Sequence, residues 1–350
     1  MVQKQEFRIP EMTPRQIYGE LDRYVIGQQD AKRAAAVGAY NHIKRVNAVL
    51  RGEKTLLKKT NMLLAGPTGS GKTHIARTLA GILDLAFVVA DATEYTEAGY
   101  YGKDVEVMVG ELLFSTDLDV DRTETGIIFL DEIDKIARRS GAMRTGAGSR
   151  DIGGEGVQQS LLKLLEGRKI FVPLNVTQHW NKHDFVPIDT TNILFICAGT
   201  FTDVWQKQSG DIGFGGQKDE AASPGLTSRR LADFGLLPEL LGRLPVVVEL
   251  QRLREDALLD ILTTPPDSLT REYTEVLGRD GVEAEFCEDG LRLMARHALG
   301  KELGARSLRA IMETVMHDLL FDGPELKGKH IRIDAAYVAP RLGVTKTAEQ

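Results

Sequence analysis

Gly66-Pro67-Thr68-Gly69-Ser70-Gly71-Lys72-Thr73 is the stretch of sequence that decides the fold. It follows an apolar run at 62–65 that is typical of a buried strand, and it precedes a helical pattern at 74–83. Strand, glycine-rich loop and helix in this order are the context of a phosphate-binding loop, which a chance glycine-rich turn lacks. The glycines let backbone N–H groups converge on a polyphosphate, and the helix N-terminus adds its positive dipole end. We expect Lys72 to reach the β- and γ-phosphates and the Thr73 hydroxyl to hold Mg²⁺.

A second motif, Gly126-Ile127-Ile128-Phe129-Leu130-Asp131-Glu132, is an apolar strand that ends in two carboxylates. We expect Asp131 to bind Mg²⁺ at the carboxyl end of this strand, through water or together with Thr73. Glu132 is placed to orient and polarise a water molecule against the γ-phosphate. An ordinary solvated strand end is the alternative, and the neighbouring phosphate-binding loop disfavours it. Glu132 favours hydrolysis over simple nucleotide binding.

Composition excludes several classes of protein. The 350 residues predict about two domains, and the 42% hydrophobic and 27% charged content is that of a soluble globular protein. The sequence contains neither an apolar run of membrane-spanning length nor a signal-peptide core at its start, so no membrane partner is expected. A formal charge of −6 argues against broad nucleic-acid binding. The two cysteines, Cys197 and Cys287, form neither a zinc finger nor a disulfide scaffold, which favours a cytoplasmic location.

The pattern of strands and helices predicts an α/β fold. Helical patterns alternate with further strand candidates at 87–90, 127–130, 193–196 and 246–250. Such alternation indicates a mainly parallel sheet covered on both faces. Glycine-rich stretches at 140–156 and 206–227 are predicted to be loops.

The character of the chain changes near residue 250. A helical pattern at 289–299 and an apolar stripe at helical spacing from Leu308 to Leu319 precede a short strand at 329–333. We therefore divide the chain into a large ATPase domain at 1–248 and a smaller, mainly helical domain at 249–340. The large domain includes an N-terminal helix that starts at Thr13-Pro14, and residues 341–350 are expected to be a disordered tail.

An ordered series of short motifs extends through almost the whole chain. They are Val25-Ile26-Gly27-Gln28, Tyr40-Asn41-His42, Ala90-Asp91-Ala92-Thr93, Thr96-Glu97-Ala98-Gly99, Asp131-Glu132-Ile133-Asp134-Lys135, Gly154-Glu155-Gly156-Val157-Gln158-Gln159, Phe234-Gly235-Leu236-Leu237-Pro238-Glu239, Gly242-Arg243-Leu244-Pro245 and Gly304-Ala305-Arg306-Ser307-Leu308-Arg309. With the phosphate-binding loop, this series resembles the ClpX family of AAA+ protein unfoldases. The series is far more specific than the loop, which many ATPases share.

The resemblance implies roles at the nucleotide. Arg243 matches the arginine finger, which reaches the nucleotide of a neighbouring subunit and stabilises charge on the transferred phosphoryl group. Arg306 matches the second sensor arginine, which contacts the nucleotide of its own subunit. Val25, Ile26 and Gly27 match the segment that lines the adenine pocket. Thr200 is a candidate for the first sensor. Either arginine alone is equally well explained as an ordinary exposed side chain.

The resemblance also implies contacts with a protein substrate. Gly99-Tyr100-Tyr101-Gly102 matches the first pore loop, in which Tyr100 would grip a polypeptide by dispersion and apolar contact. The family reads Gly-Tyr-Val-Gly here, so Tyr101 is a departure that adds bulk; a tyrosine-rich surface turn is the alternative. The segment 150–157, which begins with Arg150, resembles the second pore loop.

Ile212, Gly213 and Phe214 match the tripeptide that docks the family onto the ClpP peptidase ring. An exposed Ile and Phe in a polar stretch are costly unless they bind a partner or fold back onto the body. The implied partners are therefore five other copies of the chain in a ring of six, a ClpP-like peptidase, and unfolded or tagged protein substrates. The implied ligands are ATP and Mg²⁺.

Two departures from the family are visible. The family usually begins with a four-cysteine zinc-binding domain, which this sequence does not contain; a truncated chain and a naturally short relative are both compatible with this. The third pore segment reads Gln178-His179-Trp180-Asn181-Lys182-His183, where the family has an Arg-Lys-His cluster. His179 and His183 lack an acidic third ligand, so we expect no zinc site.

Three alternative functions stay open at this stage. One is a chaperone or remodelling ATPase that acts without a protease. Another is an HslU-type unfoldase, although the chain lacks room for the large inserted domain of that family. The last is a nucleic-acid motor or clamp loader of the same superfamily, which the paired tyrosines and the net negative charge disfavour.

Overall fold

The computed structural model describes residues 9–96, 103–137, 154–173, 185–202, 204, 225–301 and 303–344. The chain divides into two compact units. The first comprises residues 1–18, 30–66 and 72–250, and the second comprises residues 19–29, 67–71 and 251–350.

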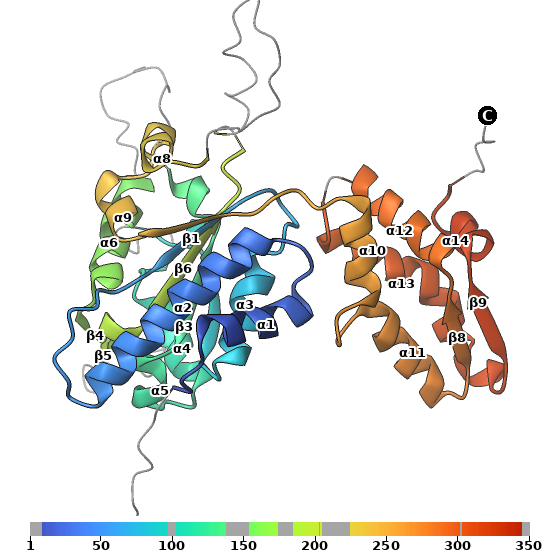
Figure 1. The fold of residues 1–350 in the computed structure, drawn as a ribbon, viewed down its shortest axis with the longest axis horizontal. Coiled ribbons are helices and arrows are strands. Elements are labelled where there is room, and N and C mark those ends of the chain that lie inside the picture. Colours follow the sequence, from blue (N-terminus) through green and yellow to red (C-terminus); the bar gives the residue numbers. More distant parts are fainter. Residues whose placement is uncertain are drawn as a thin grey trace, which may run out of the picture. The chain divides into compact units, whose positions relative to one another are not determined.

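A five-stranded parallel sheet forms the centre of the first unit (Figure 1). Its order is β2-β3-β6-β1-β7, and each neighbouring pair is parallel. The strands are β1 (Met62–Ala65), β2 (Phe87–Asp91), β3 (Ile127–Asp131), β6 (Leu194–Gly199) and β7 (Val246–Glu249). The predicted α/β class is confirmed, and all five apolar runs that predicted strands lie in this sheet.

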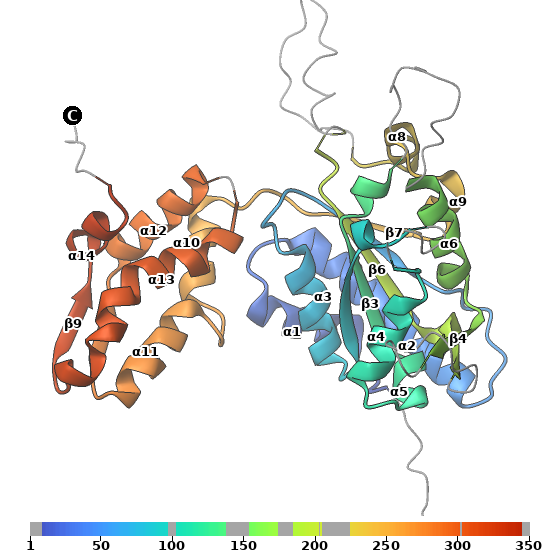
Figure 2. The same ribbon diagram turned by 180° about the vertical axis from the view of Figure 1, so that it is seen from behind.

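Helices surround the sheet and connect its strands. They are α2 (Gln29–Leu50), α3 (Lys72–Ile82), α4 (Val107–Ser115), α5 (Val120–Glu124), α6 (Gly154–Glu166), α8 (Ser228–Phe234) and α9 (Pro238–Gly242), with the short 3₁₀ helices η1 (Ala92–Glu94), η2 (Ile133–Ile136) and η3 (Thr190–Asn192). Helix α1 (Pro14–Tyr24) is divided between the two units. Figure 1 shows α2 across one face of the sheet, and Figure 2 shows α4 on the other. On the α2 side the packing is close, because a Cβ at Gly38 would lie 2.6 Å from the Met62 methyl carbon.

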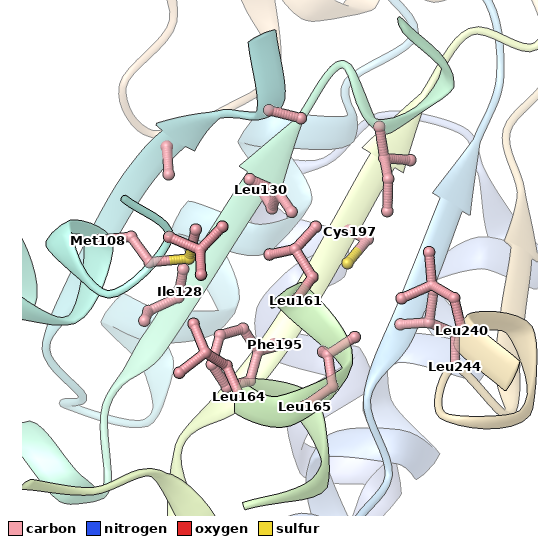
Figure 3. Packing of buried hydrophobic residues seen from close by; sticks show 14 of the residues in the cluster. Met108, Ile128, Leu130, Leu161, Leu164, Leu165, Phe195, Cys197, Leu240 and Leu244 are labelled. Carbon is pink, nitrogen blue, oxygen red and sulfur yellow. The ribbon is translucent and has the colours of Figure 1, made fainter. Parts of the chain in front are cut away.

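The main core lies on the α4 and α6 side of the sheet. Strands β3 and β6 present Ile128, Leu130, Phe195 and Cys197 to this side, where each is almost fully buried (Figure 3). Helix α6 covers them with Leu161, Leu164 and Leu165, α9 adds Leu240, and Leu244 follows just after α9. Burial of such side chains stabilises the fold by roughly 1.5–3 kcal/mol each.

The structure corrects one boundary. The glycine-rich segment 140–156 was predicted to be a loop, but its last three residues open helix α6. Gly154 is required there by close approach, since a Cβ would lie 2.5 Å from the Ile136 carbonyl oxygen. Gly154 therefore allows α6 to pack closely against Ile136 and is not a source of loop flexibility. A second small sheet, the antiparallel pair β4 (Lys169–Pro173) and β5 (Phe185–Asp189), was not predicted.

The chain after residue 250 forms a mainly helical body around its own core. Its helices are α10 (Glu255–Thr263), α11 (Leu269–Arg279), α12 (Glu288–Gly300), α13 (Arg306–Phe321), η4 (Gly323–Leu326) and α14 (Ala335–Arg341). Strands β8 (Glu283–Phe286) and β9 (His330–Ile333) form a parallel pair. The apolar stripe of α13 is buried against this body, as its helical spacing predicts. None of the helices in the described residues is both long and apolar enough to cross a lipid bilayer.

Candidate nucleotide-binding site

The phosphate-binding loop follows β1, the strand next to the edge strand β7 of the sheet. Strand β1 lies between β6 and β7. Backbone hydrogen bonds to the ends of these two neighbours continue past the last residue of β1. The Gly66 N–H donates to the Gly199 carbonyl (3.2 Å), and the Leu250 N–H donates to the Ala65 carbonyl (2.7 Å). A Cβ at Gly66 would lie 2.6 Å from the Leu250 carbonyl oxygen, so only glycine fits where the loop begins.

The backbone of the loop is shaped for an anion. Gly69 (φ 71°) and Gly71 (φ 101°) adopt the left-handed region, which turns successive N–H groups toward a common side. Helix α3 begins at Lys72, directly after this turn. The loop thus leads directly into the N-terminus of an eleven-residue helix, the end that favours a bound anion.

Two side chains of the loop fit a bound polyphosphate. Lys72 is 7% exposed, and its ammonium donates to the Gly66 carbonyl at the start of the loop (2.7 Å). Lys72 therefore already bends back over the turn where phosphate oxygens would lie. The Ser70 hydroxyl is buried and has no hydrogen-bond partner among the described residues. A buried hydroxyl without a partner is costly unless a ligand satisfies it, and an ammonium beside it favours a negatively charged ligand. The residues present therefore fit a nucleotide triphosphate.

The two carboxylates lie at the carboxyl edge of the same sheet, at the end of β3. Asp131 is the last residue of the strand, and its Oδ1 accepts the N–H of Glu132 (2.9 Å). Glu132 has φ 56° and ψ 32°, a left-handed conformation that is uncommon for a non-glycine residue. Such backbone strain gathers at functional sites, where the surrounding structure holds it. Its side chain is exposed at this edge of the sheet, with no capping bond to helix η2.

A third carboxylate lies beside this pair. Asp91 ends β2, and the parallel register places it opposite Asp131. The Asp91 carboxylate is hydrogen-bonded to a nearby residue: its Oδ1 accepts from both the N–H and the hydroxyl of Thr93 (2.8 and 2.6 Å). Carboxylates and a threonine hydroxyl are oxygen ligands of the kind that Mg²⁺ prefers, so the donor set fits this ion. No group of three or more His, Cys, Asp or Glu side chains in the described ranges is arranged to hold a metal ion.

Thr200, the candidate first sensor, is connected to the carboxylate segment. It follows β6, the strand between β3 and β1. Its hydroxyl donates to Asp134 Oδ2 (2.8 Å), which also accepts the N–H of Phe201 (3.2 Å). Asp134 lies two residues after Glu132, so these bonds fix η2 to the end of β6. Asp134 belongs to the same run, Asp131-Glu132-Ile133-Asp134-Lys135, but no local signal in the sequence marks it as a partner of Thr200.

Arg243 caps the C-terminal end of α9 in the first unit. Its Nη2 lies 2.6 Å from Oε1 of Glu166, the last residue of α6. The side chains are 53% and 47% exposed, so the arginine is presented at the surface. Surface exposure is what a finger directed at another subunit requires.

The remaining predicted nucleotide contacts belong to the second unit. Arg306 is exposed and is the first residue of α13. Val25, Ile26 and Gly27 follow α1; Val25 is buried and Gly27 is left-handed (φ 66°). Pro67 and Thr68 complete the loop, with Thr68 exposed.

Several predicted residues lie outside the described part of the chain. They are Tyr100, Tyr101, Arg150, Ile212, Gly213, Phe214 and the segment 178–183. Their assigned roles therefore stay predictions from the sequence.

Comparison with known proteins identifies what this arrangement is similar to. A family model described as "AAA domain (Cdc48 subfamily)" matches residues 57–247, which contain the whole central sheet. A Porphyromonas gingivalis protein named "ATP-dependent Clp protease ATP-binding subunit ClpX" is 41% identical over 345 residues, which cover 95% of this chain and 82% of that protein. A Wolinella succinogenes protein named "ATP-dependent Clp protease ATP-binding subunit ClpX 2" is 42% identical over 313 residues, covering 89% of this chain and 78% of the relative.

Proposed function

Because the chain belongs to the ClpX family of AAA+ ATPases and hydrolyses ATP, we propose that it uses this hydrolysis to unfold proteins and thread them into a peptidase. The observation that supports the proposal is the carboxyl edge of the parallel sheet: β1 leads into the phosphate-binding loop, and β3, separated from β1 by β6, ends in the Asp131-Glu132 pair. The similarity to a protein named as a Clp protease subunit extends through 95% of the chain, and it supports the same function for the parts of the chain outside this sheet.

In the proposed reaction the chain's own residues bind and orient the triphosphate. The N–H groups of the loop and Lys72 hold the phosphate oxygens, and the Val25–Gly27 segment lines the adenine pocket. Thr73 and Asp131 would hold Mg²⁺, which when bound neutralises charge on the phosphates. Glu132 orients the attacking water and accepts its proton.

Two arginines complete the proposed site. Arg243 acts on the nucleotide of a neighbouring subunit, where its guanidinium stabilises charge on the transferred phosphoryl group. Its surface position in the described structure supports action on another chain. Arg306 contacts the nucleotide of its own subunit and couples hydrolysis to movement of the C-terminal body. If Arg243 of each subunit reaches the site of the next one, the contacts run head to tail, and we propose that they close into a ring of six copies of the chain.

The output of the proposed cycle is mechanical. Tyr100 grips the substrate in the central channel, with Tyr101 beside it and Arg150 in a second pore segment. Ile212, Gly213 and Phe214 dock the ring onto a ClpP-like peptidase, where several weak anchors gain from multivalency. We propose a cytoplasmic location for this machine.

The proposal is tested with a folded fluorescent reporter that carries a C-terminal degradation tag. Purified chain, ATP and ClpP peptidase should degrade the reporter, and omission of any one should stop degradation. Tyr100→Ala should keep ATP hydrolysis and lose reporter unfolding. Unfolding of the reporter without any ClpP binding would favour a protease-independent chaperone. Stimulation of hydrolysis by DNA rather than by unfolded protein would favour a nucleic-acid motor.

A further inference from the structure

A buried glutamine lies where three separate segments of the first unit meet. Gln158, in the second turn of α6, is 0% exposed. Its Nε2 donates to the carbonyl of Ile136 (2.8 Å) and to that of Gly235 (3.3 Å). Its Oε1 accepts the N–H of Leu237 (2.8 Å). Both ends of one buried amide are thus used to bind backbone groups that are distant in sequence.

The bonded segments belong to two functional parts of the subunit. Ile136 ends η2, the short helix that follows the Asp131-Glu132 pair. Gly235 and Leu237 form the turn into α9, and Leu237 is its N-cap. Helix α9 in turn ends at Arg243, the proposed finger. Gln158 therefore joins the catalytic side of a subunit to the helix that carries its finger.

A second buried amide holds the other end of α9. Asn61 is 1% exposed, and its Nδ2 donates to the carbonyl of Arg243 (3.0 Å) and to that of Leu165 (3.3 Å). Its Oδ1 accepts the N–H of Phe195 (3.3 Å). Asn61 directly precedes β1, the strand that leads into the phosphate-binding loop. Leu240, which lies between these two ends, and Leu244, which directly follows Arg243, pack in the same buried cluster as Leu161 and Leu165 of α6 (Figure 3).

We propose that Gln158 is a positioning residue for Arg243: it fixes the finger helix α9 to the segment behind the subunit's own catalytic carboxylates. The inference rests on the proposed function, because it assumes that Arg243 acts on a neighbouring subunit. Gln158 does not touch the nucleotide. It acts by setting where the finger lies relative to the subunit that presents it.

The chemistry of the amide makes this role specific. A methionine has nearly the same shape and fills the same buried volume, yet it neither donates to two carbonyls nor accepts from the Leu237 N–H. Gln158→Met should therefore keep the packing of α6 and release the turn into α9. A displacement of about 1 Å at a reacting group lowers rates by up to roughly a hundredfold. We therefore expect slower ATP hydrolysis when α9 is no longer held and Arg243 is displaced.

The test uses mixed rings in which one subunit lends its finger to another. The finger donor carries Glu132→Gln, so its own site is inactive and Arg243 is intact. The site provider carries Arg243→Ala, so its site is intact and its finger is missing. Each chain alone should be nearly inactive, and the mixture should regain ATP hydrolysis. Gln158→Met is then placed either in the donor or in the provider, and the kcat and KM for ATP of the mixture are measured.

In the donor, Gln158→Met should lower the restored kcat by roughly tenfold or more and leave KM for ATP nearly unchanged. In the provider, the same substitution should change kcat by less than about twofold, which is the range expected when no reacting group moves. Loss confined to the provider, equal loss in both positions, or no loss in either would overturn the inference. If the mixture with intact Gln158 regains no hydrolysis, Arg243 does not act in trans, and the failure belongs to the proposed function.

The chain offers a matched control at the next residue. Gln159 is exposed on the same helix, so Gln159→Met in the donor should leave the restored kcat unchanged.

Co-purification through a tag on the donor shows whether the Gln158→Met chain still enters mixed rings. If the Gln158→Met chain does not enter them, the comparison is repeated with Gln158→Glu, which keeps an oxygen for the Leu237 N–H and removes both amide donors. A Gln158→Glu donor with full activity would also contradict the inference.

Discussion

The guanidinium of Arg243 is paired with the carboxylate of Glu166, with Nη2 and Oε1 2.6 Å apart. Both residues end a helix, since Glu166 closes α6 and Arg243 caps α9. About half of each side chain is exposed, so water competes with the pair and little stability depends on it. If Arg243 is the proposed finger, this weak ion pair is one that it can exchange for an anion on another subunit.

Substitution of Glu166 and substitution of Arg243 are expected to affect ATP hydrolysis differently. Glu166→Gln should change the free energy of unfolding by less than about 1 kcal/mol, as measured by urea denaturation. Arg243→Ala should cause a similarly small change in stability but lower kcat for ATP by roughly a thousandfold, as loss of an arginine finger does. Normal hydrolysis by Arg243→Ala would show that this arginine is a surface residue without a catalytic role.

Glu132→Gln should separate nucleotide binding from hydrolysis. The amide keeps the size of the side chain but does not accept a proton, so kcat should fall by about 10²- to 10⁴-fold. Affinity for ATP should persist, because the loop and Lys72 are unchanged. Binding is measured with a fluorescent ATP analogue and hydrolysis by phosphate release. Wild-type hydrolysis by the variant would remove Glu132 from the reaction.

Gly66→Ala should damage the start of the phosphate-binding loop. The added methyl would lie 2.6 Å from the Leu250 carbonyl oxygen, so β1 and the strand end beside it must separate. We expect a lower unfolding free energy by about 1–3 kcal/mol and weaker ATP binding. Gly81→Ala is the matched control, since it lies in helix α3 and meets no atom within 4 Å. That substitution should stabilise the protein by up to about 1 kcal/mol. Equal stability of the two variants would contradict the close approach.

The buried His42 predicts loss of stability in acid. Complete burial, together with the nearby charges of Arg45 and Lys59, lowers its pKa from 6.5 to about 3. Between these two pKa values the unfolded chain binds a proton that the folded chain excludes. The free energy of unfolding therefore falls as the pH is lowered below about 6.5, by up to about 1.4 kcal/mol per pH unit.

The measurement is urea denaturation between about pH 6.5 and pH 4.5, the range in which the unfolded histidine gains its proton. His42→Phe should have a shallower dependence on pH than the unsubstituted chain, whatever its absolute stability. The exposed His317 provides the control, and His317→Gln should keep the original slope. An unchanged slope in His42→Phe would show that the folded protein accepts a proton at His42.

The elements that the sequence predicts well are those whose signals are local. Each strand of the central sheet is an apolar run of four to six residues, and the phosphate-binding loop carries its own glycines. The carboxylate pair was placed correctly because it directly follows such a run. In contrast, the glycines at 154–156 indicated a loop, whereas close approach to Ile136 makes Gly154 part of a packed helix.

The interactions that escaped prediction depend on distant partners. Gln158 binds backbone groups 22, 77 and 79 residues away, and Asn61 binds the Arg243 carbonyl 182 residues away. Nothing in the local sequence distinguishes buried Gln158 from exposed Gln159, apart from the helical spacing that puts one of them on the inner face. The pair formed by Glu166 and Arg243 is likewise visible only after folding.

The central claim is that ATP hydrolysis at the edge of the parallel sheet drives protein unfolding. The most direct measurement is the fluorescence of a tagged, folded reporter that cannot refold, followed with this chain and ATP in the presence of ClpP. We predict steady loss of fluorescence that stops when Glu132→Gln replaces the unsubstituted chain. Fluorescence that stays constant while ATP is consumed, or that falls equally with Glu132→Gln, would contradict the claim.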